Sequence, residues 1–182
     1  TKVNVFAAPK IQYSYSSSVT CGTIRYISQI TGSQYFNWSY WPASAFGEYY
    51  STGWECGTCS ISMALSYIGI NKTPKQILEA NNGVTYFTGW GATLSSPSVS
   101  GGMDNYLNGK GKYSPVIVHF PKSSTYPNGH FVILIDRLSS SSYQVLDCAK
   151  DTTWNLSTSS SLYKQIDKVY QYYNPSAVIP AD

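Results

Sequence analysis

Two cysteines, Cys56 and Cys59, stand at the beginning of the segment with the clearest helical pattern in the chain. Apolar residues recur at spacings of three and four over residues 55–68 and form one face of a helix. At a helix N-terminus, unpaired backbone N–H groups and the positive end of the helix dipole favour a thiolate over a thiol. The sequence therefore predicts a nucleophilic cysteine at the first turn of this helix.

A histidine and an aspartate that could activate such a thiol lie in the C-terminal half. Short runs rich in Val, Ile and Tyr predict β-strands there, and these runs are residues 115–120, 130–136 and 143–146. The polar connection 137–142 predicts an antiparallel hairpin, in which the start of one strand lies beside the end of the next. His130 and Asp147 then become approximate cross-strand neighbours. The carboxylate would orient the imidazole and stabilise the imidazolium, while the other ring nitrogen faces the thiol.

The chain has two histidines, so the two can be compared as candidate bases. His119 lies inside the strand predicted over 115–120, between apolar residues and without an acid at a matching position. We therefore interpret His119 as structural. His130 stands at the start of its strand, directly after an Asn-Gly turn, where its ring can meet both a thiol and an acid.

The elements that must position these residues follow a simple order along the chain. Further short helices are expected at residues 21–30, 73–80, 103–107 and 162–169, the second of them with Thr73 as N-cap and Pro74 in its first turn. Irregular segments are expected at residues 1–20, 34–54 and 84–102, and a Tyr-rich tail at the end of the chain. Because the helices precede the sheet, the pattern predicts an α+β fold rather than a doubly wound parallel fold.

Composition limits the class of protein. The chain has 182 residues and only 12% charged residues, against about 25% in ordinary soluble domains. The net charge of +3 is spread along the chain, so no nucleic-acid partner is expected. The longest apolar stretches, residues 115–120 and 131–135, are too short to span a bilayer. The first residues show no signal-peptide pattern, so the chain could be cytosolic or the mature part of a secreted protein. A Tyr- and Ser-rich, Lys- and Glu-poor composition favours the extracellular alternative, and we expect a monomer.

The string from Cys56 to Gly69, Cys-Gly-Thr-Cys-Ser-Ile-Ser-Met-Ala-Leu-Ser-Tyr-Ile-Gly, resembles a motif of a known family. It is similar to the nucleophile helix of the bacteriocin-processing (double-glycine-peptidase-like) branch of the papain-like cysteine peptidases. Pro-Val-Ile-Val at 115–118, His-Phe-Val-Ile at 130–133 and Asp147 are similar to the later motifs of this family, in the same order. The resemblance covers about residues 34–150.

The resemblance implies a papain-like fold with the nucleophile at a helix start, packed on a C-terminal antiparallel sheet. It implies Cys56 as nucleophile, His130 as general base and acid, and Asp147 as the residue that orients His130. It also implies a peptide or protein substrate and no cofactor. We expect one domain over 1–182, with an edge segment at 1–33, a catalytic core at 34–150 and a C-terminal extension at 151–182.

Three positions depart from the family pattern. Gly57, Thr58 and Cys59 follow Cys56 where the family often has Gly-Pro-Thr, so Cys59 is a rival nucleophile; we prefer Cys56 because the following Met-Ala-Leu is in register with it. The family usually supplies an oxyanion-hole glutamine upstream, and Gln34 is a distant match for it. Asp147 is followed by Cys-Ala rather than by the common proline.

Other interpretations of the same residues stay open. Cys56 and Cys59 could form a structural disulfide, a thioredoxin-like redox motif or, with His130 and Cys148, a zinc site that has only one Cys-x-x-Cys knuckle. If Cys56 is the nucleophile, at least one of the other cysteines is unpaired, and Cys59 with Cys148 is a conceivable pair. The chain could also be an inactive binding module, or an acyltransferase, transglutaminase or cell-wall amidase with the same triad. Aromatic residues that precede Cys56 could belong to the core or line a substrate cleft, and these are Trp38, Trp41, Tyr49, Tyr50 and Trp54.

Overall fold

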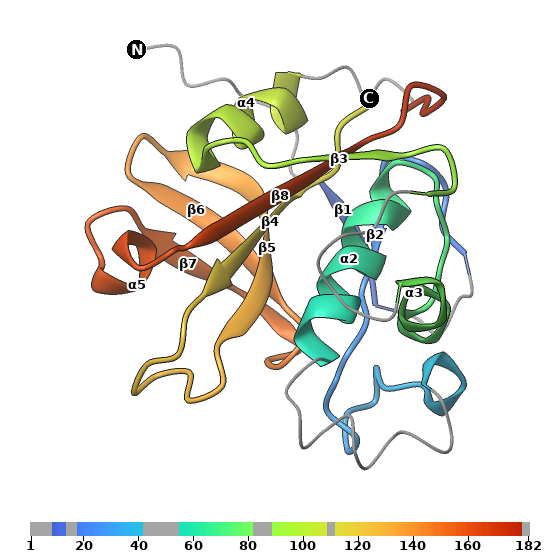
Figure 1. The fold of residues 1–182 in the computed structure, drawn as a ribbon, viewed down its shortest axis with the longest axis horizontal. Coiled ribbons are helices and arrows are strands. Elements are labelled where there is room, and N and C mark those ends of the chain that lie inside the picture. Colours follow the sequence, from blue (N-terminus) through green and yellow to red (C-terminus); the bar gives the residue numbers. More distant parts are fainter. Residues whose placement is uncertain (1–8, 14–17, 42–54, 82–88, 109–111, 180–182) are drawn as a thin grey trace.

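A six-stranded antiparallel sheet and the helices on its two faces form an α+β fold (Figure 1). The structure is a computed structural model and describes residues 9–13, 18–41, 55–81, 89–108 and 112–179. The strand order in the sheet is β3-β8-β4-β5-β6-β7. The strands are β3 Thr93–Ser95, β4 Val116–Phe120, β5 His130–Ser139, β6 Ser142–Asp147, β7 Thr152–Ser157 and β8 Lys168–Tyr173. The α+β class predicted from the order of the elements is confirmed.

The predicted hairpin between the second and third strands is present as β5 and β6. Ile133 pairs with Leu146 in antiparallel register, so the start of β5 lies beside the end of β6. The strands are longer than their apolar runs, and only residues 140 and 141 connect them. Backbone pairing extends beyond the apolar runs into polar residues. The apolar pattern of a sequence shows which residues are buried and does not show where strand pairing ends.

Apolar side chains of the central strands alternate between two cores. On β4 and β5, Ile117 and Ile133 belong to the core that contains α2, whereas Val118 and Val132 belong to the core that contains α4. Successive side chains of a strand point to opposite faces of the sheet. Both faces are therefore covered, which explains the unbroken apolar runs at 116–118 in β4 and 131–135 in β5.

Helix α2, Glu55–Tyr67, is the helix predicted over 55–68. It packs against β5 on one side and against β2 and α3 on the other, so it is buried almost all round. Small hydroxyl residues occupy the face away from the sheet. Ser62 and Ser66 are buried there and bond to Arg25, and Ser62 also donates to the carbonyl oxygen of Lys72. Their small size lets β2 and α3 approach the helix closely.

The next helix, α3 (Pro74–Asn81), begins where its sequence signal predicts. The Thr73 hydroxyl accepts the Gln76 backbone N–H at 3.2 Å, and the Gln76 side chain accepts the Thr73 backbone N–H at 3.0 Å. This reciprocal pair is a capping box that satisfies two otherwise unpaired backbone donors. The expected N-cap role of Thr73 is confirmed.

The prediction of a helix over residues 21–30 is wrong. Residues Thr23–Arg25 form strand β2, which pairs in parallel with β1, Lys10–Gln12, in the segment expected to be irregular. The expected helix rested on isoleucines at three-residue spacing, and two of these, Ile24 and Ile27, are buried in the core that contains α2, whereas Ile30 is exposed. Arg25 is fully buried, and its guanidinium donates to Ser62 and to the carbonyl oxygen of Lys72. These contacts with distant residues override the local helical pattern.

Residues 84–102, expected as a loop, include β3 and the beginning of helix α4, Val99–Asn108. The helix expected over 103–107 therefore starts earlier. The sequence did not indicate this earlier start, because Gly102 lowers the helix propensity of the segment. A Cβ at Gly102 would lie 2.9 Å from the Val116 side chain. The glycine thus permits α4 to lie close to β4.

The C-terminal segment 151–182, expected as an extension to a core at 34–150, supplies two strands of the main sheet. Strand β8 pairs with β3 on one side and with β4 on the other, and it is the long red strand in Figure 1. The helix expected over 162–169 is only the short α5, Ser161–Lys164, and β8 follows it. Within the described part of the chain, no helix combines the length and apolar character needed to cross a bilayer.

Candidate active site

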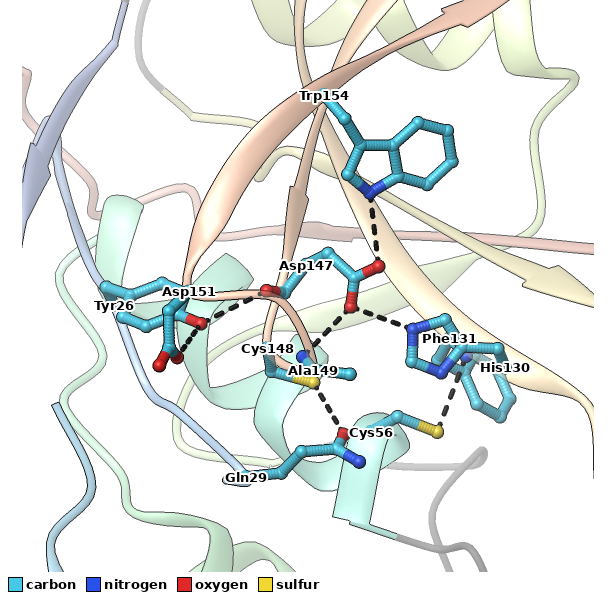
Figure 2. Close-up of polar contacts among 10 residues, drawn as sticks. All are labelled: Tyr26, Gln29, Cys56, His130, Phe131, Asp147, Cys148, Ala149, Asp151 and Trp154. Carbon is cyan, nitrogen blue, oxygen red and sulfur yellow. Dashed lines mark hydrogen bonds and ion pairs between the residues drawn. The ribbon is translucent and has the colours of Figure 1, made fainter. Parts of the chain in front are cut away.

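Cys56, His130 and Asp147 meet where three elements end or begin (Figure 2). Cys56 lies in the first turn of α2, His130 is the first residue of β5, and Asp147 is the last residue of β6. The His130 Nε2 atom lies 2.8 Å from Asp147 Oδ1, and the backbone N–H of Phe131 donates to the Cys56 sulfur at 3.4 Å. The three side chains are nearly excluded from solvent, with exposed fractions of 5% for Cys56, 6% for His130 and 0% for Asp147.

The Asp147 carboxylate accepts hydrogen bonds at both oxygens. Besides His130, the backbone N–H of Ala149 donates to Oδ1 at 2.9 Å and the indole N–H of Trp154 donates to Oδ2 at 3.1 Å. Burial alone would raise the pKa of Asp147, but the hydrogen bonds and the charge of His130 outweigh it and hold the pKa below the usual value. Asp147 is therefore an anion at neutral pH, fixed in one orientation.

His130 is set up to carry a positive charge. Burial alone lowers its pKa, but hydrogen bonds and charge interactions with Asp147 and Cys56 are stronger together and raise the pKa to about 9. Because Asp147 holds Nε2, Nδ1 is the ring nitrogen left to exchange a proton with Cys56.

An aromatic ring covers the imidazole of His130. The Tyr126 ring stacks on it with centroids 4.7 Å apart and an angle of 25°, and Phe120 stacks on Tyr126 at 5.5 Å. Backbone hydrogen bonds hold Tyr126 in the loop between β4 and β5: its carbonyl oxygen accepts from Ser123 and Gly129. The face of an aromatic ring attracts a cation, so this stack favours the imidazolium.

We expect Tyr126→Leu to lower the pKa of His130 by roughly half a pH unit, because a cation–aromatic contact contributes about 0.5–1 kcal/mol and 1.36 kcal/mol corresponds to one pKa unit. Tyr126→Phe keeps the ring and should leave the pKa unchanged. An NMR titration of the His130 ring measures both. If His130 had the same pKa in the Leu and Phe variants, the Tyr126 ring would only cover the imidazole and would not stabilise its positive charge.

Gln34, the glutamine expected to help bind an oxyanion, lies in a turn and its side chain is exposed. A second glutamine, Gln29, contacts the residue that follows Asp147: its Oε1 atom accepts the thiol hydrogen of Cys148 at 2.9 Å, and its backbone N–H donates to the Cys148 carbonyl oxygen at 2.9 Å. Figure 2 shows its carboxamide at the first turn of α2, near Cys56. No local sequence signal marks Gln29, because only the contact of this segment with the end of β6 brings it there.

The structure also separates the two cysteines of the Cys-x-x-Cys pair. Cys59 is fully buried one turn along α2 and interacts with Cys148, whereas Cys56 is the thiol that hydrogen-bonds to His130. None of the four cysteines forms a disulfide. Among the described residues, no group of three or more His, Cys, Asp and Glu side chains is arranged to hold a metal ion.

The expectation that His119 has no acidic partner is wrong. Its Nδ1 atom lies 2.6 Å from Asp167 Oδ1, and Asp167 directly precedes β8, whose position beside β4 the sequence did not reveal. The His119 ring packs on Phe131 at 4.4 Å, and a Cβ on Gly129, whose φ is +76°, would lie 2.9 Å from His119 Nε2. His119 thus supports the backbone on either side of His130, which agrees with a structural role.

Part of the aromatic segment before Cys56 is described. Trp41 is buried and stacks on Phe36, with ring centroids 6.4 Å apart, so it belongs to the core. Tyr49, Tyr50 and Trp54 lie outside the described residues.

Comparison with solved structures gives a likeness at the level of the fold. No protein-family model and no curated protein matches the chain. The peptidase domain of Streptococcus ComA, a bi-functional ABC transporter involved in a quorum sensing pathway, matches with 14% identity and a TM-score of 0.48, over 66% of this chain and 92% of that domain. Identity this low assigns neither an activity nor a substrate. In fold, the chain is similar to this peptidase domain.

Proposed function

We propose that the chain is a cysteine peptidase with Cys56 as nucleophile, His130 as general base and acid, and Asp147 as the residue that orients His130. The observation that carries the proposal is the continuous array in which a buried carboxylate holds one nitrogen of His130 and the other ring nitrogen is left for Cys56. Nucleophile, base and orienting acid within hydrogen-bond reach of one another are typical of thiol hydrolases.

In the proposed reaction, the Cys56 thiolate attacks the carbonyl carbon of a peptide bond. The backbone N–H groups at the start of α2 and the Nε2–H group of Gln29, which replaces Gln34 in this role, would stabilise the oxyanion. His130 then gives its proton to the leaving amine and a thioester forms on Cys56. Water, deprotonated by His130, hydrolyses the thioester and regenerates the thiol.

The nature of the substrate and the location of the enzyme belong to the same proposal. Only 12% of the residues are charged, which favours a peptide with uncharged or apolar side chains at the site. We also propose that the protein acts outside the cell as a monomer. Recognition would rest on shape and apolar contact more than on charge.

Alkylation of the native protein tests the nucleophile without knowledge of the substrate. We expect iodoacetamide at pH 7, without reductant, to label Cys56 first, as read by peptide mapping. Cys59 and Cys148 are fully buried and serve as internal controls, and burial raises the pKa of the half-exposed Cys21, which slows its reaction. Preferential labelling of Cys59, or no labelling of Cys56, would contradict the proposal. Cleavage of a fluorogenic peptide library by the same preparation would then identify the preferred residues.

A further inference from the structure

Two consecutive residues at the end of β6 hold two different parts of the site. Asp147 binds the ring of His130, and Cys148 binds the side chain of Gln29. Gln29 is also tied to the same segment through its backbone N–H, which donates to the Cys148 carbonyl oxygen. The end of β6 therefore fixes both the base and the amide that lies at the start of α2 (Figure 2).

The Cys148 thiol can act only as a donor toward the Gln29 oxygen. Cys148 is fully buried, and burial together with the neighbouring Cys59 and Asp147 raises its pKa well above the ordinary value, so the thiol keeps its hydrogen. A carboxamide oxygen accepts hydrogen bonds and its nitrogen only donates them. A thiol donor at Oε1 therefore selects one of the two amide orientations, the one in which Nε2 points away from Cys148.

We propose that Cys148 is a positioning residue, whose thiol hydrogen bond holds the Gln29 carboxamide with its N–H groups directed at the oxyanion formed beside Cys56. This inference rests on the proposed peptidase function and adds a residue that no substrate touches. It also gives a role to one of the two cysteines that depart from the family pattern. Without the thiol, the amide would sample both orientations and would lose part of its stabilising effect on the transition state.

Serine and alanine at position 148 form a matched pair for the test. They are similar in size, but only Cys148→Ser keeps a hydrogen-bond donor. We expect Cys148→Ala to lower kcat for acylation by a p-nitrophenyl ester about 10- to 100-fold with KM nearly unchanged, because loss of one oxyanion donor costs about 10²- to 10³-fold. Cys148→Ser should stay within about threefold of the wild type on the same basis.

Three controls separate positioning from packing. Alkylation of Cys56 by iodoacetamide forms no oxyanion, so its rate should not change in either variant. Cys148→Ala combined with Gln29→Ala should lose no more activity than Gln29→Ala alone. Cys21→Ala, which removes a thiol that donates to the Tyr67 carbonyl oxygen far along α2, should retain full activity. If Cys148→Ala fails to fold, Cys148→Val removes the donor and keeps the side-chain volume.

Equal losses in the Ser and Ala variants, or additive losses in the double variant, would overturn the inference. NMR of the Gln29 side-chain amide keeps the test independent of activity. We expect its two proton signals to shift or broaden in Cys148→Ala and to stay near their wild-type positions in Cys148→Ser. If the wild type forms no acyl-enzyme, the peptidase proposal fails, and unchanged Gln29 signals in Cys148→Ala would then overturn this inference separately.

Discussion

Replacement of Cys56 by alanine is expected to abolish peptide hydrolysis, with kcat reduced by at least about 10⁴-fold, because no other group can form the thioester. Cys59→Ala should retain most of the activity. Cys59 lies one turn deeper in α2, is fully buried and interacts with Cys148, whereas Cys56 hydrogen-bonds to His130. Initial rates on the best peptide of a fluorogenic library, compared for the two variants at equal concentration, measure the difference.

The two alanine variants control for each other, since both remove one thiol from the same helix. Thermal unfolding should show that Cys56→Ala remains folded, because Cys56 lies at the edge of the core. The opposite pattern, in which Cys59→Ala is inactive and Cys56→Ala is active, would identify Cys59 as the nucleophile. Full activity in both variants would exclude a thiol mechanism.

The second large effect is expected from Asp147→Asn, which should lower kcat/KM by about 10³- to 10⁴-fold, as removal of the orienting acid does in other hydrolytic triads. The amide keeps the shape of the side chain and removes its charge. Without that charge, burial dominates the pKa of His130, which falls from about 9. The alkaline limb of the pH–rate profile, placed near pH 9 in the wild type, should therefore move to lower pH in the variant.

The raised pKa of His130 also makes the free energy of unfolding depend on pH. The pKa of His130 is raised in the folded state, so its contribution to folding is fully present below about pH 6.5, the pKa of an unfolded histidine, and is lost as the pH rises through about 9. Urea unfolding between pH 6 and 10 should show this loss in the wild type and a smaller loss in Asp147→Asn.

Asp167→Asn is the matched control, since it neutralises the acid of the other His–Asp pair. It should leave the alkaline limb in place. A shift of the limb in Asp167→Asn and none in Asp147→Asn would assign the acid–base role to His119 instead of His130.

The parts of the fold that the sequence predicted are those with strong local signals. Helix α2 has apolar residues at helical spacing, α3 has a capping box that begins at Thr73, and the β5–β6 hairpin has apolar strands around a polar turn. Each signal lies within a few residues of the element it specifies. The hairpin in turn predicted the approach of His130 and Asp147, because antiparallel pairing fixes which strand ends are adjacent.

The parts that the sequence did not reveal depend on contacts between distant segments. The segment 21–30, which contains β2, was predicted as a helix because its isoleucines have helical spacing, and the pairing of β2 with β1 and its contact with α2 decided otherwise. Helix α4 was predicted too short because of its glycines, one of which, Gly102, allows close packing on Val116 of β4. Strand β8 was taken for a helix and a tail, since nothing local indicates its place between β3 and β4.

The sequence by itself determined the types of the reactive groups and two of their supports: a thiol at a helix start, and a histidine and an aspartate on one hairpin. The tertiary structure decided which cysteine hydrogen-bonds to the histidine, and it placed Gln29 beside Cys148, next to Asp147. It also placed Tyr126 over His130 and Trp154 on Asp147. The physical reason is the distance along the chain over which each signal acts. Hydrophobic periodicity and helix capping act within one or two turns, whereas these contacts join segments that are brought together only by the packing of the whole sheet and its helices.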